Sequence, residues 1–210
     1  MSQKTNPFVR AVRNTLRLVR LDSLGRSLFH RLQRIGKPAY VPMPSETSKC
    51  RARLAPWCAG YGIDLGFGGD PLTPASIRMD LPRPYADYLG DAHPVQLGGD
   101  VVDLFWFRDG VLDYVYSSHV LEDFVDVESV LKEWLRVLRP GGRLVIYCPD
   151  EQVYRRHCTA TGQPYNTHHI HADFSLAFVQ RALARLGLTR ELHSAPLVEI
   201  YSWEIVVEKL

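Results

Sequence analysis

From residue 61 onward, short apolar runs alternate with segments of helical periodicity, and this alternation limits the chain to few folds. The pattern predicts strands near 61–65, 77–80, 94–97, 112–117 and 143–148, and helices near 127–138 and 174–186. Two closing runs near 191–198 and 201–208 have only Glu199 and Ile200 between them, so they predict a hairpin with one antiparallel strand. Strands separated by helices are typical of a doubly wound α/β sheet that is mostly parallel.

The N-terminal quarter of the chain has a different composition. The net charge is only +2, yet residues 1–53 hold 12 Lys and Arg against 2 acids, whereas residues 54–210 hold 13 against 21. Residues 1–37 predict a basic amphipathic arm of two short helices, because apolar and Arg positions recur at helical spacing. Three prolines between residues 38 and 49 indicate a linker, which we place at 38–53, with the main domain at 54–210.

The basic arm is open to three interpretations. Its apolar and Arg faces suit a peripheral contact with an anionic membrane surface. Alternatively, the apolar face packs on the domain and the arginines are solvated, or the arm is an organellar transit peptide. The chain shows neither an apolar run long enough for a transmembrane helix nor a secretory signal. We therefore expect a cytoplasmic protein, whose association with a membrane would occur through the basic arm.

The stretch GIDLGFGGDP, residues 62–71, puts glycines directly after the first predicted strand. In an open α/β sheet, ligands bind beyond the carboxyl ends of the strands, where glycines let them approach the backbone. A dinucleotide site would need a helix to follow, but position 71 is proline and no helix-length pattern comes after it. Asp80 ends the second strand, where a carboxylate can accept from both hydroxyls of a ribose, and Asp100 can accept from an adenine amine.

Two longer stretches complete the pattern. Residues 112–124 read LDYVYSSHVLEDF, and residues 135–150 read LRVLRPGGRLVIYCPD, a helix end, a Pro-Gly-Gly turn and a strand. In this order and spacing, residues 61–150 resemble the class I S-adenosylmethionine (SAM)-dependent methyltransferases, in the branch with the type 11 methyltransferase domain. The resemblance implies a seven-stranded Rossmann-like sheet, SAM as cofactor and an EC 2.1.1 activity. The cofactor-binding residues that it implies are Asp64, Gly66, Gly68, Gly69, Asp70, Asp80, Asp100, Val101 and Ser117.

Two departures from the family pattern stand out. Asp70 occupies a position that is usually glycine, and only DPLTPAS fills the place of a helix between the glycine motif and Asp80. We therefore expect this helix to be lost or reduced to a turn, with Asp70 binding the ammonium group of the ligand. A weakened cofactor site would instead indicate a non-catalytic binding or scaffold protein with the same fold.

Methyl transfer in such a domain requires a nucleophile aligned with the methyl group of SAM, and a base to remove the proton if the nucleophile is a hydroxyl. Candidate catalytic residues beyond the fourth and fifth strands are His119, Asp150, His168 and His169, with Glu151 as a further candidate base beside Asp150. Residues 154–174 are polar and aromatic and predict an acceptor-binding loop. His119 could equally hold this loop by hydrogen bonds, and the histidines at 168, 169 and 171 could ligate a metal, although a bare H-H-x-H run more often lies on a loop surface.

The resemblance implies methyl transfer, and because similar proteins often act in surface-polysaccharide or glycolipid pathways, we expect O-methylation of a small-molecule or saccharide acceptor. A nucleic-acid substrate is disfavoured because YCPD, residues 147–150, stands where a motif of the Asn-Pro-Pro-Tyr kind would act on exocyclic amines. A homodimer is left open.

Overall fold

A computed structural model describes residues 44–82 and 93–210, and Pro44–Leu210 forms one compact unit. The basic arm at 1–37 and the first part of the predicted linker lie outside the described residues.

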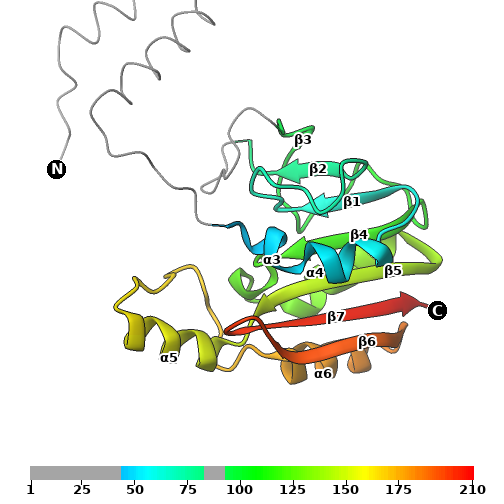
Figure 1. Cartoon of the computed structure of the whole chain (residues 1–210). Helices are drawn as coiled ribbons and strands as arrows, with labels where there is room; N and C mark the ends of the chain where they lie inside the picture. Colours follow the sequence, from blue (N-terminus) through cyan, green and yellow to red (C-terminus); the bar gives the residue numbers. More distant parts are fainter. Residues whose placement is uncertain (1–43, 83–92) are drawn as a thin grey trace, which may run out of the picture. The chain divides into compact units, whose positions relative to one another are not determined.

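The described strands form one seven-stranded sheet in the order β3-β2-β1-β4-β5-β7-β6 (Figure 1). The strands are β1 (Gly62–Leu65), β2 (Ile77–Asp80), β3 (Leu97–Gly98), β4 (Leu112–Ser118), β5 (Leu138–Pro149), β6 (Thr189–Val198) and β7 (Ser202–Lys209). β7 pairs antiparallel with β5 and β6, and the other pairings are parallel. The predicted sheet and its closing hairpin are therefore confirmed. β5 begins earlier than predicted, because Leu138 already pairs with Leu112 ahead of the Pro-Gly-Gly turn.

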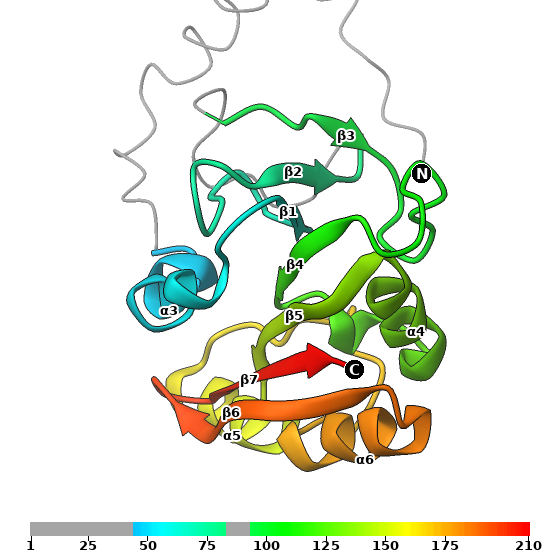
Figure 2. The same cartoon turned by 90° about the vertical axis from the view of Figure 1, so that its right-hand side faces the viewer.

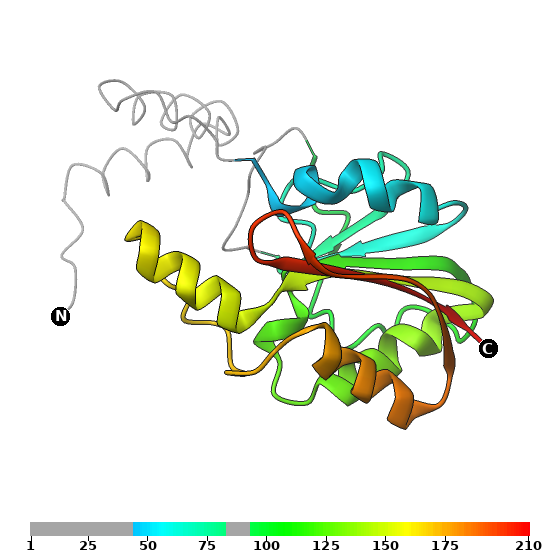
Figure 3. The same cartoon turned by 60° about the horizontal axis from the view of Figure 1, so that its bottom comes forward.

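Helices lie on both faces of the sheet. They are α3 (Glu46–Leu54), α4 (Val127–Val137), α5 (Glu151–Thr161) and α6 (Leu176–Leu186), with the short 3-10 helices η1 (Ala55–Trp57) and η3 (Leu121–Asp123). α3 covers one face of the sheet, and α4 and α6 cover the other (Figures 2 and 3). Between β1 and β2 the chain forms only turns, so the expected loss of the helix at this position is confirmed.

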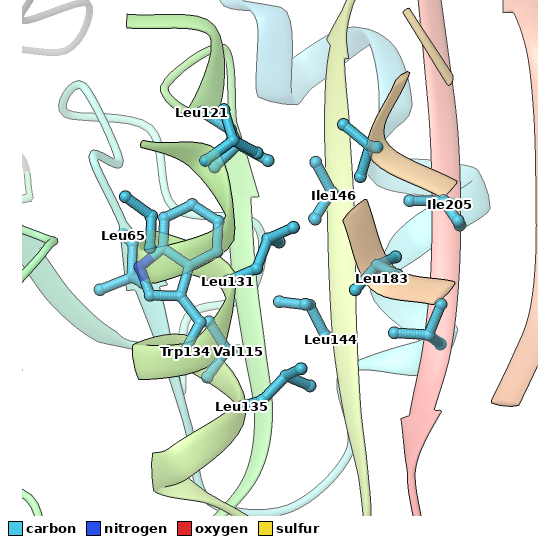
Figure 4. Close-up of a cluster of buried hydrophobic side chains, with 14 of the residues drawn as sticks. Leu65, Val115, Leu121, Leu131, Trp134, Leu135, Leu144, Ile146, Leu183 and Ile205 are labelled. Carbon is cyan, nitrogen blue, oxygen red and sulfur yellow. The ribbon is translucent and has the colours of Figure 1, made fainter. Parts of the chain in front are cut away.

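The larger core lies between the sheet and the pair α4 and α6 (Figure 4). Trp134 of α4 is fully buried there, and its indole Nε1–H donates to the backbone carbonyl of Val101 at 2.9 Å. This bond fixes the loop that follows β3. The core therefore sets the position of a segment at the ligand-binding edge of the sheet.

The opposite face of the sheet is covered by α3, which differs from the prediction that residues 46–53 are linker. The helix begins after Ser45, whose hydroxyl accepts from the Ser48 N–H, and it buries Thr47, Cys50 and Leu54. These side chains pack in a second cluster with three tyrosines of the sheet, Tyr114, Tyr116 and Tyr147. The helix has a polar average composition, so its narrow buried stripe gives a weak signal in the sequence.

α5 is the second element that the sequence did not predict, since it occupies the first half of the expected loop at 154–174. Asp150 caps it by accepting from the Val153 N–H, and Gly162 ends it in a left-handed conformation. The helix extends beyond the end of β5 (Figure 1). Among the helices of the described part of the chain, none has the length and apolar character needed to cross a lipid bilayer.

Candidate active site

A pocket of about 440 Å³ opens at the carboxyl ends of the parallel strands. The turn after β1, the end of β2 and the loop after β3 form one half of its lining. The segment after β4, the N-terminus of α3, α5 and the loop at 166–169 form the other half, together with Tyr201 between β6 and β7. This is the edge of an α/β sheet where ligands bind.

The turn after β1 requires glycine, because its residues adopt backbone conformations that side chains rarely allow. Gly66 has φ +67°, and a Cβ there would lie 2.4 Å from Cγ2 of Val120. Gly68 has φ +56°, and its N–H donates to Oδ2 of Asp80 at 3.0 Å. Both line the pocket, whereas Gly69, with φ +85°, does not.

Three further predicted cofactor residues line the same half of the pocket. Asp80 is 8% exposed, and its Oδ1 accepts from the Leu81 N–H at 2.7 Å. Asp100 is exposed, and Val101 beside it is held by Trp134. Each carboxylate oxygen has more than one lone pair, so Asp80 can hold the turn and still accept from a ribose hydroxyl. The open glycine turn and the two acids thus fit SAM.

Asp64 and Ser117 are buried and lie outside the pocket lining, so their role as ligand contacts stays a prediction. Asp64 is fully buried, and its Oδ2 accepts from the Leu72 N–H at 2.7 Å. Burial raises the pKa of Asp64 to about 8. The Ser117 hydroxyl donates to the backbone carbonyl of Leu65 at 3.1 Å. Both residues shape the ends of β1 and β4 that carry the site.

Asp70 is engaged with α3 and lies outside the pocket lining, contrary to the expectation that it binds an ammonium group. Its Oδ1 lies 2.5 Å from a guanidinium nitrogen of Arg51, and its Oδ2 accepts from the Ser45 hydroxyl. This acid therefore ties the glycine turn to the helix that covers the sheet.

His119 is placed in the second half of the pocket by an unusual backbone conformation. Its φ is +53°, a left-handed value that few residues other than glycine adopt. Its Nε2 lies 3.4 Å from Oε2 of Glu46 and 3.4 Å from the Ser202 hydroxyl. Burial lowers the pKa of His119 to about 4, although the nearby carboxylate of Glu46 acts in the opposite direction. The imidazole is therefore neutral at physiological pH and can accept a proton.

The other predicted catalytic residues divide into pocket and structural positions. His169 lines the pocket, is buried, and its Nδ1 lies 2.8 Å from Oε2 of Glu151. His168 also lines the pocket and is exposed. Asp150 lies outside this lining, and its carboxylate caps α5, so its catalytic role stays a prediction.

Two glutamates of the site were not predicted, Glu46 from α3 and Glu122 from η3, whereas Glu151 of α5 is a candidate base from the sequence. Glu46 lines the pocket, and the other two are buried directly behind its histidines. Glu122 follows His119 by three residues, which was the only signal in the sequence that could have linked the two. Among the described residues, no group of three or more His, Cys, Asp or Glu is arranged to hold a metal ion.

Comparisons with known proteins agree with this geometry. Residues 77–146 match the family model described as a methyltransferase domain. A demethylmenaquinone methyltransferase of Mycolicibacterium vanbaalenii is 33% identical over 90 residues, which span 43% of this chain but only 31% of that protein.

Solved structures extend the likeness of the fold. A SAM-dependent methyltransferase of Thermotoga maritima is 20% identical with a TM-score of 0.58, over 79% of this chain and 88% of that one. A SAM-dependent methyltransferase of Archaeoglobus fulgidus is 16% identical with a TM-score of 0.58, over 78% of this chain and 94% of that one. With the strand order, these likenesses show that the chain has the fold of the class I SAM-dependent methyltransferases, and residues 77–146 are similar to their methyltransferase domain.

Proposed function

We propose that this protein transfers a methyl group from SAM to a hydroxyl oxygen of a small-molecule or saccharide acceptor. The observation that carries the proposal is the composition of a single pocket. One half offers an open glycine turn with Asp80, and the other half offers His119, a neutral, half-buried imidazole beside the carboxylate of Glu46.

The chain's own residues have separate tasks in this reaction. When bound, SAM supplies a methyl group on a positively charged sulfur, already activated for transfer. Gly66, Gly68, Asp80 and Asp100 would hold it. His119 accepts the proton of the acceptor hydroxyl at Nε2, and Glu46 stabilises the imidazolium that results. Burial opposes ionisation of Glu46, but His119, Lys49 and Tyr201 together hold its pKa below the usual value, so it is charged at neutral pH.

The acceptor half of the pocket favours a neutral, hydroxyl-rich molecule. Tyr154 and Tyr201 line it, and aromatic faces suit the apolar faces of sugar rings. Arg155, which could otherwise attract an anionic acceptor, is bound to Glu151 at 2.6 Å and to the Tyr165 hydroxyl at 2.9 Å. Glu46 and the neutral imidazole of His119 in this half can accept hydrogen bonds from sugar hydroxyls.

Calorimetric titration with SAM and its demethylated product tests the cofactor half. Asp80→Ala should weaken binding by about 1–3 kcal/mol, the range for charge-assisted hydrogen bonds. Asp103→Ala removes the same charge from the loop after β3, outside the pocket lining, and should leave the affinity unchanged. If the intact protein bound neither ligand, the non-catalytic scaffold would become the better interpretation.

An acceptor screen with His119→Asn tests the other half. Asparagine tolerates the left-handed backbone of this position but cannot act as a base. We expect turnover to fall about 10²- to 10⁴-fold while SAM affinity is preserved. Unchanged turnover would reduce His119 to a structural role.

We also propose that residues 1–37 make a peripheral membrane contact, because their basic and apolar positions suit anionic headgroups. Flotation with anionic liposomes of the full chain and of a chain lacking residues 1–37 tests this. Equal flotation of both forms would dismiss the arm as an anchor.

A further inference from the structure

Glu122 is a buried carboxyl group whose position calls for an explanation. It lies in η3 directly after the His119 segment and is 1% exposed. Within the described part of the chain, neither carboxyl oxygen has a strong hydrogen-bond partner, and the donors beside it are the weak, titratable thiol of Cys148 and the backbone N–H of Glu122 itself. Buried polar atoms are nearly always well hydrogen-bonded, so a carboxyl this poorly satisfied beside a pocket points to a role in the site.

The carboxyl lies between two histidines of the pocket, half-buried His119 and buried His169. Its Oε1 is 3.7 Å from Nδ1 of His119 and 3.7 Å from Nε2 of His169. The remaining ring nitrogens each face another glutamate, since Nε2 of His119 lies 3.4 Å from Glu46 and Nδ1 of His169 lies 2.8 Å from Glu151. Carboxyl and imidazole groups thus alternate along one line from Glu46 to Glu151.

The two 3.7 Å separations are longer than hydrogen bonds, so a hydrogen-bonded line requires a small approach of Glu122 to each ring. The roles in such a line can be assigned if Glu122 is neutral. Burial raises the pKa of Glu122 to about 8, and the charges of Asp123 and Glu151 act in the same direction. A protonated carboxyl has one O–H donor and keeps acceptor capacity. His169 donates from Nδ1 to Glu151, so its Nε2 can accept from the O–H of Glu122. His119 can then donate from Nδ1 to Glu122, which leaves a lone pair on Nε2 that can accept from the Ser202 hydroxyl, 3.4 Å away. The Glu46 carboxylate, also 3.4 Å from Nε2, favours the opposite tautomer, so the proton on Nδ1 depends on Glu122.

We propose that Glu122 acts as a neutral positioning residue that holds His119 and His169 in complementary tautomers. This inference rests on the proposed function, because the tautomer it selects leaves Nε2 of His119 ready to take the proton of the acceptor hydroxyl. The acceptor oxygen keeps the electron pair of its O–H bond, and His119 becomes a cation beside the carboxylate of Glu46. Glu122 touches neither acceptor nor cofactor in this arrangement and acts through the two histidines.

Several titratable or charged groups face His119 from the elements packed against it, and any pH dependence must be compared with theirs. They are Glu46 and Lys49 of α3, Glu122 of η3, Tyr147 of β5, His169 of the pocket loop and Tyr201 between β6 and β7.

Nitrogen-15 NMR of histidine-labelled protein tests the proposal without acceptor or cofactor. Glu122→Gln preserves one donor and one acceptor, so His119 should keep the tautomer protonated at Nδ1, as in the natural protein. Glu122→Ala should release both histidines into mixed tautomers. Glu128→Gln, at an exposed position of α4 paired with Arg185, is the matched control and should change neither ring. Unaltered tautomers in a folded Glu122→Ala variant would overturn the proposal.

A pH titration keeps the proposal falsifiable if Glu122→Ala does not fold. In the natural protein, the resonances of both histidines should shift with a common midpoint near pH 8 as Glu122 ionises, and Glu122→Gln should abolish this midpoint. A midpoint that persists in Glu122→Gln would assign it to another group and refute the inference. Saturable shifts of both rings on addition of Mg²⁺ or Zn²⁺ at neutral pH would also refute it, since Glu122 would then be a metal ligand.

Once an acceptor is found, turnover gives a further readout. Glu122→Gln should keep kcat within about threefold of the natural protein at pH 7, whereas Glu122→Ala should lower kcat more than it changes KM. Equal losses in both variants would contradict a role for the neutral acid. The NMR result does not depend on turnover, so failure of the proposed reaction and failure of this inference can be told apart.

Discussion

The burial of Asp64 beneath the glycine turn predicts how the free energy of unfolding depends on pH, because its carboxyl is fully buried. Oδ2 accepts from the Leu72 N–H, and Oδ1 has no hydrogen-bond partner among the described residues. Burial raises the pKa from 3.8 to about 8. The folded protein therefore holds a proton that the unfolded chain releases above pH 4. A carboxyl with a raised folded pKa contributes stability that is fully present below pH 4 and is lost as pH rises to about 8.

The substitution Asp64→Asn isolates this contribution. Asparagine keeps an oxygen for the Leu72 N–H and does not titrate, so the variant should gain stability relative to the natural protein as pH rises. The gain is about 1.4 kcal/mol per pH unit between pH 5 and 8, or about 4 kcal/mol over that range. Urea unfolding at each pH, followed by the fluorescence of the buried Trp134 and Trp203, measures it.

The control is Asp126→Asn, at the exposed cap of α4, where hydrogen bonds from Ser129 lower the carboxyl pKa. Its effect on stability should be the same at every pH between 5 and 8, since that group is ionised in both states throughout. If the Asp64→Asn difference were also independent of pH, the folded protein would hold Asp64 as a carboxylate, and the reasoning from burial would be wrong.

Two further substitutions test the local geometry of the pocket. Gly66→Ala should lower stability by about 1–2 kcal/mol through its left-handed backbone, with an added loss from the overlap with Val120. Adding Val120→Ala should restore the stability lost to the overlap, but not the stability lost to backbone strain. Thermal unfolding of the single and double variants separates the two losses. Asp150→Ala should cost about 1 kcal/mol as a lost helix cap while leaving turnover within about twofold. A loss of turnover of a hundredfold or more, measured with an accepted substrate, would support a catalytic role for Asp150.

The sheet could be predicted from the sequence because its strands and two of its helices bury continuous or periodic apolar residues. α4, for example, places Val130, Leu131 and Trp134 on one buried stripe. α3 and α5 were missed because their buried faces include polar residues and because capping side chains define their starts. Ser45 and Asp150 supply those caps, and their signals were assigned to a linker and to catalysis instead.

The cofactor half of the site was also more predictable than the acceptor half. Gly66, Gly68 and Asp80 follow consecutive strands, and the carboxyl ends of parallel strands meet at one edge of the sheet. Asp64 belongs to the same motif but points behind the pocket, and spacing does not distinguish the two orientations. Glu46 and Glu151 reach their histidines from distant elements, so their contacts depend on tertiary packing that the sequence pattern does not contain.

The loss of a helix between β1 and β2 changes what α3 must do. The shortened turn is held from several sides: Asp64 accepts from Leu72, Asp70 binds Arg51 and Ser45, and the Ser76 and Tyr114 hydroxyls lie 2.9 Å apart. Since α3 supplies the partners of Asp70 and also covers the sheet, it takes over support that a helix after the turn would give.

The same helix brings Glu46 to His119. One element, α3, therefore both supports the glycine turn and supplies the carboxylate beside the proposed base. A domain that began at residue 54, as composition alone suggested, would lose Ser45, Glu46 and Arg51 together. It would lose the helix that covers one face of the sheet, the partners that anchor the glycine turn, and the carboxylate beside the proposed base. The smallest unit able to keep this pocket therefore begins at or before Pro44, where the compact unit of the structure begins.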